Sequence, residues 1–364
     1  MRSATQHVGW IGGLLALLAA TVVASAGVGP VSVPPSTTVK ALLNAAVIPT
    51  SVGLAGGETL ADPGGGLLPV LTVRTVHPFS FAVSDPMATI VVDIRLPRIL
   101  LGALVGFALS GAGAVMQGFF RNPMADPSII GVSSGAAVGA VAAITLPIGL
   151  GLHTAAFVTG VAAAFGVYVL ASEDGRTPVA TLLLAGVAVQ TFLGAVISFM
   201  LVHSGQSLRQ AIYWMMGHLH NATWAQVRIS LVVVPALFVP LLWYAGDLNV
   251  LLLGEEEAQT LGVDVERTKR ILLGLSSLLT ATAVAVAGVI GFVGLIVPHV
   301  MRLLVGPDHR ILLPTSAIAG AAFLVATDTI ARSGAAELPV GIVTAALGAP
   351  FFLFLLRRRE VHAL

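Results

Sequence analysis

Apolar runs of about 20 residues, separated by short polar connections, repeat along almost the whole chain. The hydrocarbon core of a bilayer is about 30 Å thick, and an α-helix needs about 20 apolar residues to cross it. By this measure the sequence predicts ten membrane-spanning helices, near residues 9–28, 97–118, 130–147, 152–171, 179–202, 229–246, 271–290, 291–305, 311–331 and 338–356. The chain is therefore expected to be an all-α polytopic membrane protein.

Two of these predicted helices, 130–147 and 291–305, are short and interrupted by Gly or Pro. Segments of this kind often line a transport pathway, where protein or water satisfies their free backbone groups. A kinked structural helix has the same pattern, so both interpretations stay open at this point.

The scarcity of charge supports the membrane interpretation. Hydrophobic residues make up 56% of the 364 residues and charged residues only 10%, whereas a soluble domain carries about 25% charged residues. The absence of cysteine excludes disulfides and thiolate metal sites. The net charge of +1 gives no indication of a nucleic-acid partner.

The sequence contains no ATP-binding loop of its own. Its lysines, Lys40 and Lys269, do not stand in a G-x-x-x-x-G-K-[ST] run, the motif whose backbone and Lys hold nucleotide phosphates. An H-E-x-x-H metal-binding pair is also absent from the sequence. We therefore predict no enzyme activity, no cofactor and no metal site. If ATP drives this protein, a partner subunit hydrolyses it.

Positive charges predict the orientation in the membrane. Residues 8–28 resemble a signal peptide with a small-residue cleavage site, but only Arg2 precedes them, so we interpret 1–28 as a retained first transmembrane helix. Ten helices place both termini on one side, together with 11 of the 18 Lys and Arg residues. Positively charged connections stay in the cytoplasm, so both termini, including the 357–364 tail, are predicted to be cytoplasmic.

The stretch 29–96 differs from the transmembrane core, 97–356. It is rich in Pro and Gly, with a Gly-Gly-Gly run at 64–66 and scattered Ser and Thr. We expect an external, mostly irregular extension, which serves as a spacer or as a binding surface.

The largest charged segment between two predicted helices is 248–270, on the predicted cytoplasmic side. Three carboxylates are expected to open a short helix, where the helix dipole stabilises them, and Gly262 is expected to end it in the left-handed conformation. A second short helix is predicted to start at Val263 and around Arg267. Apolar residues beside these carboxylates indicate a docking surface for a cytosolic partner. They are Leu251, Leu252, Leu253, Ala258 and Leu261.

From Arg95 onward the chain resembles the FecCD-type permeases, the membrane subunits of ABC importers for iron-siderophores, haem and cobalamin. The matching blocks, in order, are IRLPR from Ile94, SGAGAVMQGFFRNPMADPSIIGVSSGAAVG from Ser110, LLLAGVA from Leu182, LRQAIYWMMG from Leu208, GEEEAQTLGVDVER from Gly254, AVAGVIGFVGLIVPHVMRLLVGPDHRILLP from Ala285 and ELPVGIVTAALGAPFFLFLLRR from Glu337. The blocks LRQAIYWMMG and DHRILLP most resemble those of cobalamin permeases. The long 29–96 extension departs from the family pattern.

The resemblance implies ten helices, a homodimer, two cytosolic ATP-binding subunits and an extracytoplasmic substrate-binding protein. It assigns ATPase coupling to Gly254, Glu255, Glu256, Glu257, Ala258, Leu261, Gly262 and Arg267. It assigns docking of the binding protein to Arg95, Arg98 and Arg332, whose planar forks can hold carboxylates; snorkelling at the membrane interface is the alternative role. It places the inner gate at Val179 and Ala180, where ordinary helix packing is the alternative role.

Cobalamin is the first expected substrate, with an iron-siderophore or haem as the alternative. A less favoured alternative is an ion-coupled secondary transporter, because Asp328 is an intramembrane carboxylate. Asp328 stands four residues before Arg332, however, so the two can pair on one helix face. His218 and His220 could touch a metal, but residues two apart on a helix point apart. The alternative is that the segment is a loop at the headgroup region. We expect both histidines, like His299, to have no ligand.

Overall fold

The protein is described by a computed structural model at residues 4–29, 31–46, 48–55, 70–76, 78–147, 149–334 and 336–358. Within these ranges seven helices are long and apolar enough to cross a membrane, and three shorter apolar helices accompany them. The long helices are α1 (Ala4–Gly27), α4 (Leu96–Phe119), α6 (Leu152–Ala171), α7 (Val179–Val202), α9 (Trp224–Trp243), α12 (Val265–Ala287) and α14 (His309–Ala331). The shorter ones are α5 (Val132–Thr145), α13 (Val293–Val305) and α15 (Val340–Arg358). Each overlaps one of the ten predicted helices, so the predicted helical membrane fold is confirmed.

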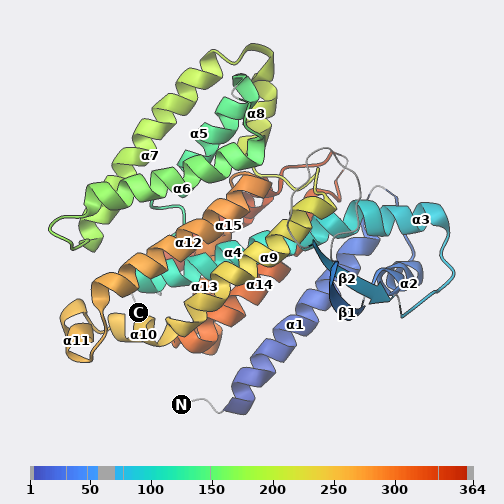
Figure 1. Cartoon of the computed structure of the whole chain (residues 1–364), viewed down its shortest axis with the longest axis horizontal. Helices are drawn as coiled ribbons and strands as arrows, with labels where there is room; N and C mark the ends of the chain where they lie inside the picture. Colours follow the sequence, from blue (N-terminus) through green and yellow to red (C-terminus); the bar gives the residue numbers. More distant parts are fainter. Residues whose placement is uncertain are drawn as a thin grey trace.

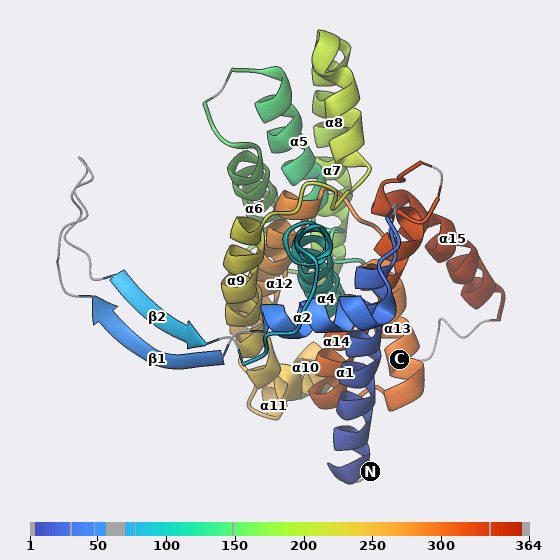
Figure 2. The ribbon, with the colours of Figure 1, turned by 90° about the vertical axis from the view of Figure 1, so that its right-hand side faces the viewer.

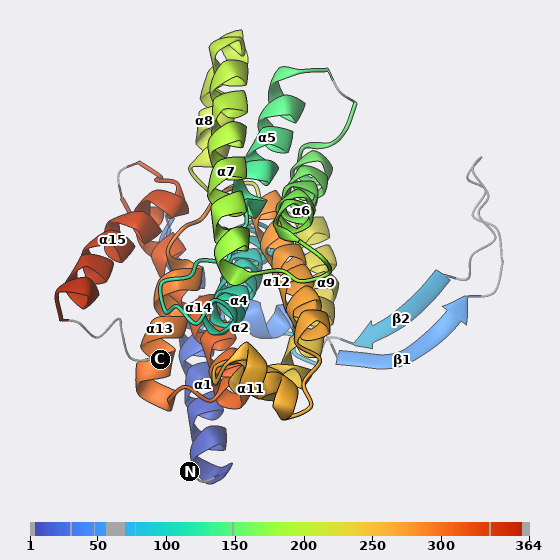
Figure 3. The same cartoon turned by 90° about the vertical axis from the view of Figure 1, so that its left-hand side faces the viewer.

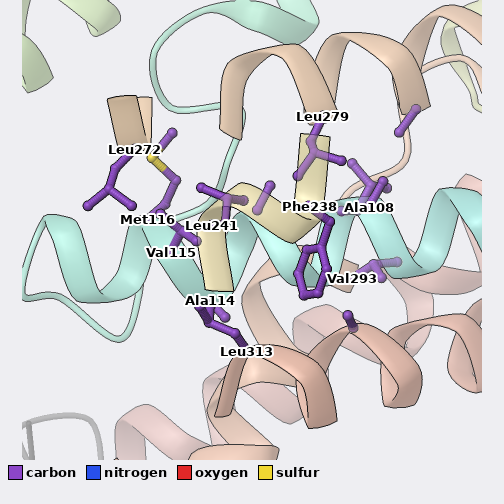
Figure 4. Packing of buried hydrophobic residues seen from close by; sticks show 14 of the residues in the cluster. Ala108, Ala114, Val115, Met116, Phe238, Leu241, Leu272, Leu279, Val293 and Leu313 are labelled. Atoms are coloured by element: carbon purple, nitrogen blue, oxygen red, sulfur yellow. The ribbon is translucent and has the colours of Figure 1, made fainter. Parts of the chain in front are cut away.

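Helix α4 runs through the centre of the bundle and packs against α9, α12, α13 and α14 (Figure 1). The close-up in Figure 4 shows its Val115 and Met116 among apolar side chains of neighbouring helices, including Leu241 and Leu272. A Cβ at Gly113 would overlap the backbone of Gly294 on α13. Small residues allow membrane helices to approach closely, and this one brings α13 against the central helix.

A second group of helices stands beside this core. It consists of α5, α6, α7, the 3₁₀ turn η2 (Gly205–Ser207) and α8 (Leu208–Met215), and Figure 3 shows it rising past the rest of the molecule. Helix α7 is the least covered, because Leu182, Gly186 and Ile197 are its buried residues and most of its other side chains are exposed or half-buried. The group therefore leaves a long apolar surface on α7 that the described part of the chain does not cover.

The described parts of the 29–96 extension are more regular than predicted. They form α2 (Pro35–Ala45), an antiparallel hairpin of β1 (Ile48–Ala55) and β2 (Val70–Val76), and α3 (Asp85–Thr89), which continues through the π-helical turn η1 (Ile90–Arg95) into α4. The Asn44 side chain exchanges two hydrogen bonds of 2.8 Å with the backbone of Phe81 and thereby joins the segments on either side of the hairpin. Figure 2 shows the hairpin projecting away from the helices. The triple-glycine run lies outside the described residues.

The 248–270 segment also differs from its predicted form. Two short helices, α10 (Ala245–Leu251) and α11 (Glu255–Thr260), precede a turn in which Gly262 adopts a positive φ of 86° as expected. The predicted second short helix around Arg267 is instead the first turn of α12. The Asp264 side chain caps this helix by accepting from the Arg267 N–H, at 3.1 Å. The cap starts a helix that the apolar run then continues without a break.

Candidate functional site

The chain has two charged ends, which Figure 1 shows at opposite limits of the helix bundle. One, here called the arginine end, contains the start of α4 and the end of α14. The other contains α10, α11 and the start of α12. Most of the residues that the sequence singles out lie at one or the other.

At the arginine end, Arg98 and Arg332 share a buried carboxylate. The Arg98 guanidinium donates two hydrogen bonds to Asp328, at 2.8 and 2.7 Å, and a third of 2.5 Å to Glu337. Nε of Arg332 lies 3.7 Å from Oδ2 of Asp328, one of the two oxygens that Arg98 also holds, at the predicted spacing of four residues. The side chain of Asp328 is only 3% exposed, whereas that of Glu337 is 43% exposed. The two arginines therefore neutralise a buried carboxylate, and Glu337 is the member of this cluster that is exposed at the surface.

Arg95 and Arg332 hold the end of α1. Arg95 donates to the carbonyl oxygens of Ala26, at 2.7 Å, and Val31, while Arg332 donates to the carbonyl and hydroxyl oxygens of Ser25. Carbonyls at a helix C-terminus carry partial negative charge and are unsatisfied within the helix. All three predicted docking arginines thus lie together, each engaged inside the chain. Their docking of a binding protein stays a prediction.

At the opposite end, α11 combines a buried anchor with exposed side chains. Ala258 is buried against the bundle, whereas Glu256, Glu257 and Arg267 are exposed and Leu253 and Leu261 are 65% and 63% exposed. Of the five apolar residues predicted to face a partner, Leu251 and Ala258 instead pack inward. Gly254 precedes the helix as its N-cap residue.

Lys269 ties α11 to α12, a role that the sequence analysis missed. Its ammonium lies 3.2 Å from Glu255 and 2.9 Å from Glu266, and the residue is 3% exposed. A buried ammonium needs carboxylate partners to offset its lost hydration. The half-exposed Glu255 is therefore engaged by Lys269 within the chain, and Glu256 and Glu257 face outward.

A second missed contact joins α10 to the start of α14. The Asn249 side chain donates to Asp308 at 2.7 Å and accepts from the backbone N–H and Nδ1 of His309, both at 2.8 Å. Although burial opposes it, hydrogen bonds from the Arg310 N–H and the Asn249 amide hold the pKa of Asp308 below its usual value. The sequence block DHRILLP contains two of these residues, but it does not indicate their partner on α10.

The predicted gate residues begin α7. Val179 is half-buried and Ala180 exposed, directly after Pro178. They lie at the first turn of the helix whose apolar surface is uncovered. No contact among the described residues assigns them a gating role, which stays a prediction.

The histidines 218 and 220 follow α8, in a non-helical connection at the arginine end. The rule that residues two apart point away from each other applies to a helix and is wrong here. Their ring centres are 4.2 Å apart, and both rings contact Tyr213.

Comparison with known proteins agrees with this architecture. Residues 17–358 match the FecCD transport family. The chain is 56% identical to the cobalamin import system permease protein BtuC of Halobacterium salinarum over the full length of both chains. It is 44% identical to the hemin transport system permease protein HmuU of Yersinia pestis, over 80% of this chain and 89% of that protein. It is 42% identical to the vitamin B12 import system permease protein BtuC of Vibrio cholerae, over 78% and 87%.

A solved structure, described as an inward-facing conformation of a metal-chelate type ABC transporter, superposes with a TM-score of 0.76. It is 30% identical to this chain and covers 96% of it, and the chain covers 98% of that structure. The ten helices, the order of the sequence blocks and these matches lead to one assignment. The chain belongs to the FecCD transport family and is a multi-pass membrane permease of that family.

Proposed function

We propose that this chain is the membrane permease subunit of an ATP-driven importer for a large metal chelate, with cobalamin as the first candidate substrate. The observation that carries this proposal is the 56% identity, over the full length of both chains, with the cobalamin import permease of Halobacterium salinarum. The sequence lacks a phosphate-binding loop, which fits a division of labour in which cytosolic subunits hydrolyse ATP.

In this proposal each of two ATP-binding subunits binds one 248–270 segment on the cytoplasmic side, where both termini also lie. The exposed Leu253 and Leu261 supply apolar contact, and Glu256, Glu257 and Arg267 supply charge. Force applied to α11 has two physical routes into the bundle. One runs through Lys269 into α12, and the other through α10, Asn249 and His309 into α14.

Two copies of the chain form the translocation path in this proposal. The exposed face of α7 is available for such a pairing, because the described part of the chain does not cover it. Val179 and Ala180 then stand near the cytoplasmic mouth of the path. An apolar constriction of this kind can close by dewetting.

The arginine end faces the extracytoplasmic binding protein in this proposal. Arg95, Arg98 and Arg332 set the position of α1, α4 and α14 there, and the half-exposed Glu337 presents the cluster to a partner. A basic partner surface contacts Glu337, whereas an acidic one competes with Glu337 for Arg98.

The second candidate substrate class is haem or an iron-siderophore, which the similarity to the hemin permease of Yersinia pestis supports. An ion-coupled transporter is less favoured. Its coupling carboxylate must exchange ions, and Asp328 is held by two hydrogen bonds from Arg98 and lies beside Arg332.

Uptake into proteoliposomes tests the proposal. The chain is reconstituted with its ATPase subunit and binding protein, and radiolabelled cobalamin is offered with ATP, without ATP, or with an ion gradient alone. We expect uptake only with ATP, and competition by cobalamin rather than by haemin. Uptake driven by the gradient without the ATPase subunit overturns the importer, whereas ATP-dependent uptake of radiolabelled haemin without uptake of cobalamin replaces cobalamin with haem.

A further inference from the structure

The histidines at the arginine end form a pocket that the proposed transport cycle does not use. A cavity of about 430 Å³ lies beside α8, between this helix, the end of α5 and the start of α6. His218, His220 and Tyr213 line it, together with the polar side chains of Gln206, Arg209 and Gln210. The pocket thus combines two imidazoles with hydrogen-bonding groups around them.

The separation of the two ring centres is compatible with neighbouring ligands on one metal. An imidazole nitrogen binds a first-row metal at roughly 2.1 Å, so the ring centre lies about 3.2 Å from the metal. Two such rings at right angles around the metal have centres about 4.5 Å apart by this geometry. The centres of His218 and His220 are 4.2 Å apart, with their planes inclined by 57°.

The surroundings position these rings and leave nitrogen lone pairs available. Tyr213 stacks on His218 with ring centres 5.3 Å apart and meets His220 edge-on at 5.1 Å. The Asn221 amide lies 2.9 Å from Nε2 of His220. With its oxygen turned toward an Nε2–H, this amide fixes the ring and leaves the Nδ1 lone pair free, as outer-shell partners of metal-binding histidines do. The His218 ring donates a hydrogen bond to its own backbone carbonyl, which leaves the lone pair of its other ring nitrogen available.

Both rings are held in the neutral form that metals require. Burial, followed by the charge of His220, lowers the pKa of His218 to about 4, and burial also lowers the pKa of His220. Neutral imidazole is the ligand form of histidine. The nearby charge of Glu337 opposes the shift at His220, while that of Arg98 adds to it.

From this geometry we infer that His218 and His220 form a binding site for a transition-metal centre that has exchangeable coordination positions. Two protein nitrogens leave positions open for water or for a second ligand set. The metal is either a free divalent ion, which both imidazoles bind, or the central metal of a chelate, whose exchangeable axial position only one of the two imidazoles binds. In the second case the inference rests on the proposed function, and Gln206, Gln210 and Arg209 lie where the polar rim of a chelate would meet them.

Binding to the purified full-length chain, freed of any affinity tag, tests the inference without ATPase, binding protein or transport. One arm titrates Cu²⁺ and records nitrogen hyperfine splitting by electron paramagnetic resonance. The other arm adds aquocobalamin, whose axial water is exchangeable, and records its visible spectrum, with cyanocobalamin as the non-exchanging control. The variants are His218→Gln/His220→Gln and His220→Gln, and His203→Gln is the matched control because His203 is an exposed histidine at the same end.

We expect wild type and His203→Gln to give a two-nitrogen copper signal that the double variant loses and His220→Gln reduces to one nitrogen. We expect Asn221→Ala to weaken copper binding about tenfold. A spectral change with aquocobalamin, absent in the double variant, identifies a chelated metal as the ligand, and copper binding alone identifies a free ion. Equal copper binding and an unchanged aquocobalamin spectrum in wild type and a folded His220→Gln variant overturn the site, whatever the outcome of the uptake assay.

Discussion

The two charged ends of the bundle use their charges in opposite ways. At the arginine end the guanidiniums are turned inward, onto Asp328 and onto the carbonyls that end α1. At the 248–270 segment one buried ammonium, Lys269, is held by two partly exposed carboxylates, and the other carboxylates and two leucines are exposed. A charge at the end of a membrane helix does not by itself indicate a docking site. A charged side chain is available to a partner protein only where no group inside the chain already engages it.

Removal of the carboxylate that Arg98 and Arg332 share, that of Asp328, is expected to have the largest effect on stability. Asp328→Asn leaves Arg98 and Arg332 buried without a full counter-charge, and the loss of one member of a buried ion pair costs about 3–5 kcal/mol. Thermal unfolding of the detergent-solubilised chain measures the effect. Glu337→Gln is the control, because its half-exposed carboxylate contributes about 1 kcal/mol or less. Similar melting temperatures for the two variants contradict an inward-turned cluster.

The hydrogen bonds of Asn249 to Asp308 and His309, which bridge α10 and α14, are expected to make the next largest contribution to stability. Asn249→Ala removes the acceptor of the fully buried His309, and a buried donor without a partner costs about 1–3 kcal/mol. If this bridge transmits force, ATP turnover persists while uptake per ATP falls. The ratio of uptake to hydrolysis in proteoliposomes measures this, with Gln259→Ala on the exposed side of α11 as the control. An unchanged ratio at reduced stability makes the bridge structural only.

Substitution of the exposed leucines is expected to weaken binding of the ATPase subunit without a change in stability. Leu253→Ser/Leu261→Ser removes apolar contact that the chain itself does not use, so unfolding stays within about 0.5 kcal/mol of wild type. Loss of two apolar contacts at an interface predicts at least about tenfold weaker binding of the ATPase subunit. Leu338→Ser, also exposed but at the arginine end, is the matched control. Equal capture of the ATPase subunit by both variants contradicts a docking surface on the 248–270 segment.

The sequence was sufficient for elements with strong periodic or local signals. The ten helices follow from apolar length, and the turn at Gly262 follows from the need for a positive φ after a short helix. The prediction of a second short helix was wrong, because Asp264 caps the long helix α12, which continues through the apolar run that follows. The hairpin was missed because β1 and β2 are short, and pairing between strands cannot be deduced from composition.

Contacts between distant residues limited the prediction of sites. The pairing of Asp328 with Arg332 was predictable from a spacing of four residues, whereas the bidentate contact with Arg98, 230 positions away, was not. Asn249 and His309 are similarly joined across 60 positions. The closeness of the two histidine rings was not predictable from a helical spacing, because the chain leaves the helical conformation before His218.

The smallest predicted effect distinguishes a docking role of the arginine end from a purely structural one. Glu337→Gln releases one nitrogen of Arg98 and leaves the two hydrogen bonds to Asp328 in place, so the fold is preserved. If an acidic side chain of the binding protein uses Arg98, removal of this internal competitor strengthens capture by up to about fivefold, the equivalent of ~1 kcal/mol for a half-exposed pair. Surface-immobilised binding protein measures the change, and the effect should fade in high salt. Weaker capture instead indicates that Glu337 itself contacts the binding protein. Unchanged capture indicates that the three arginines have only a structural role, in holding α1, α4 and α14 together.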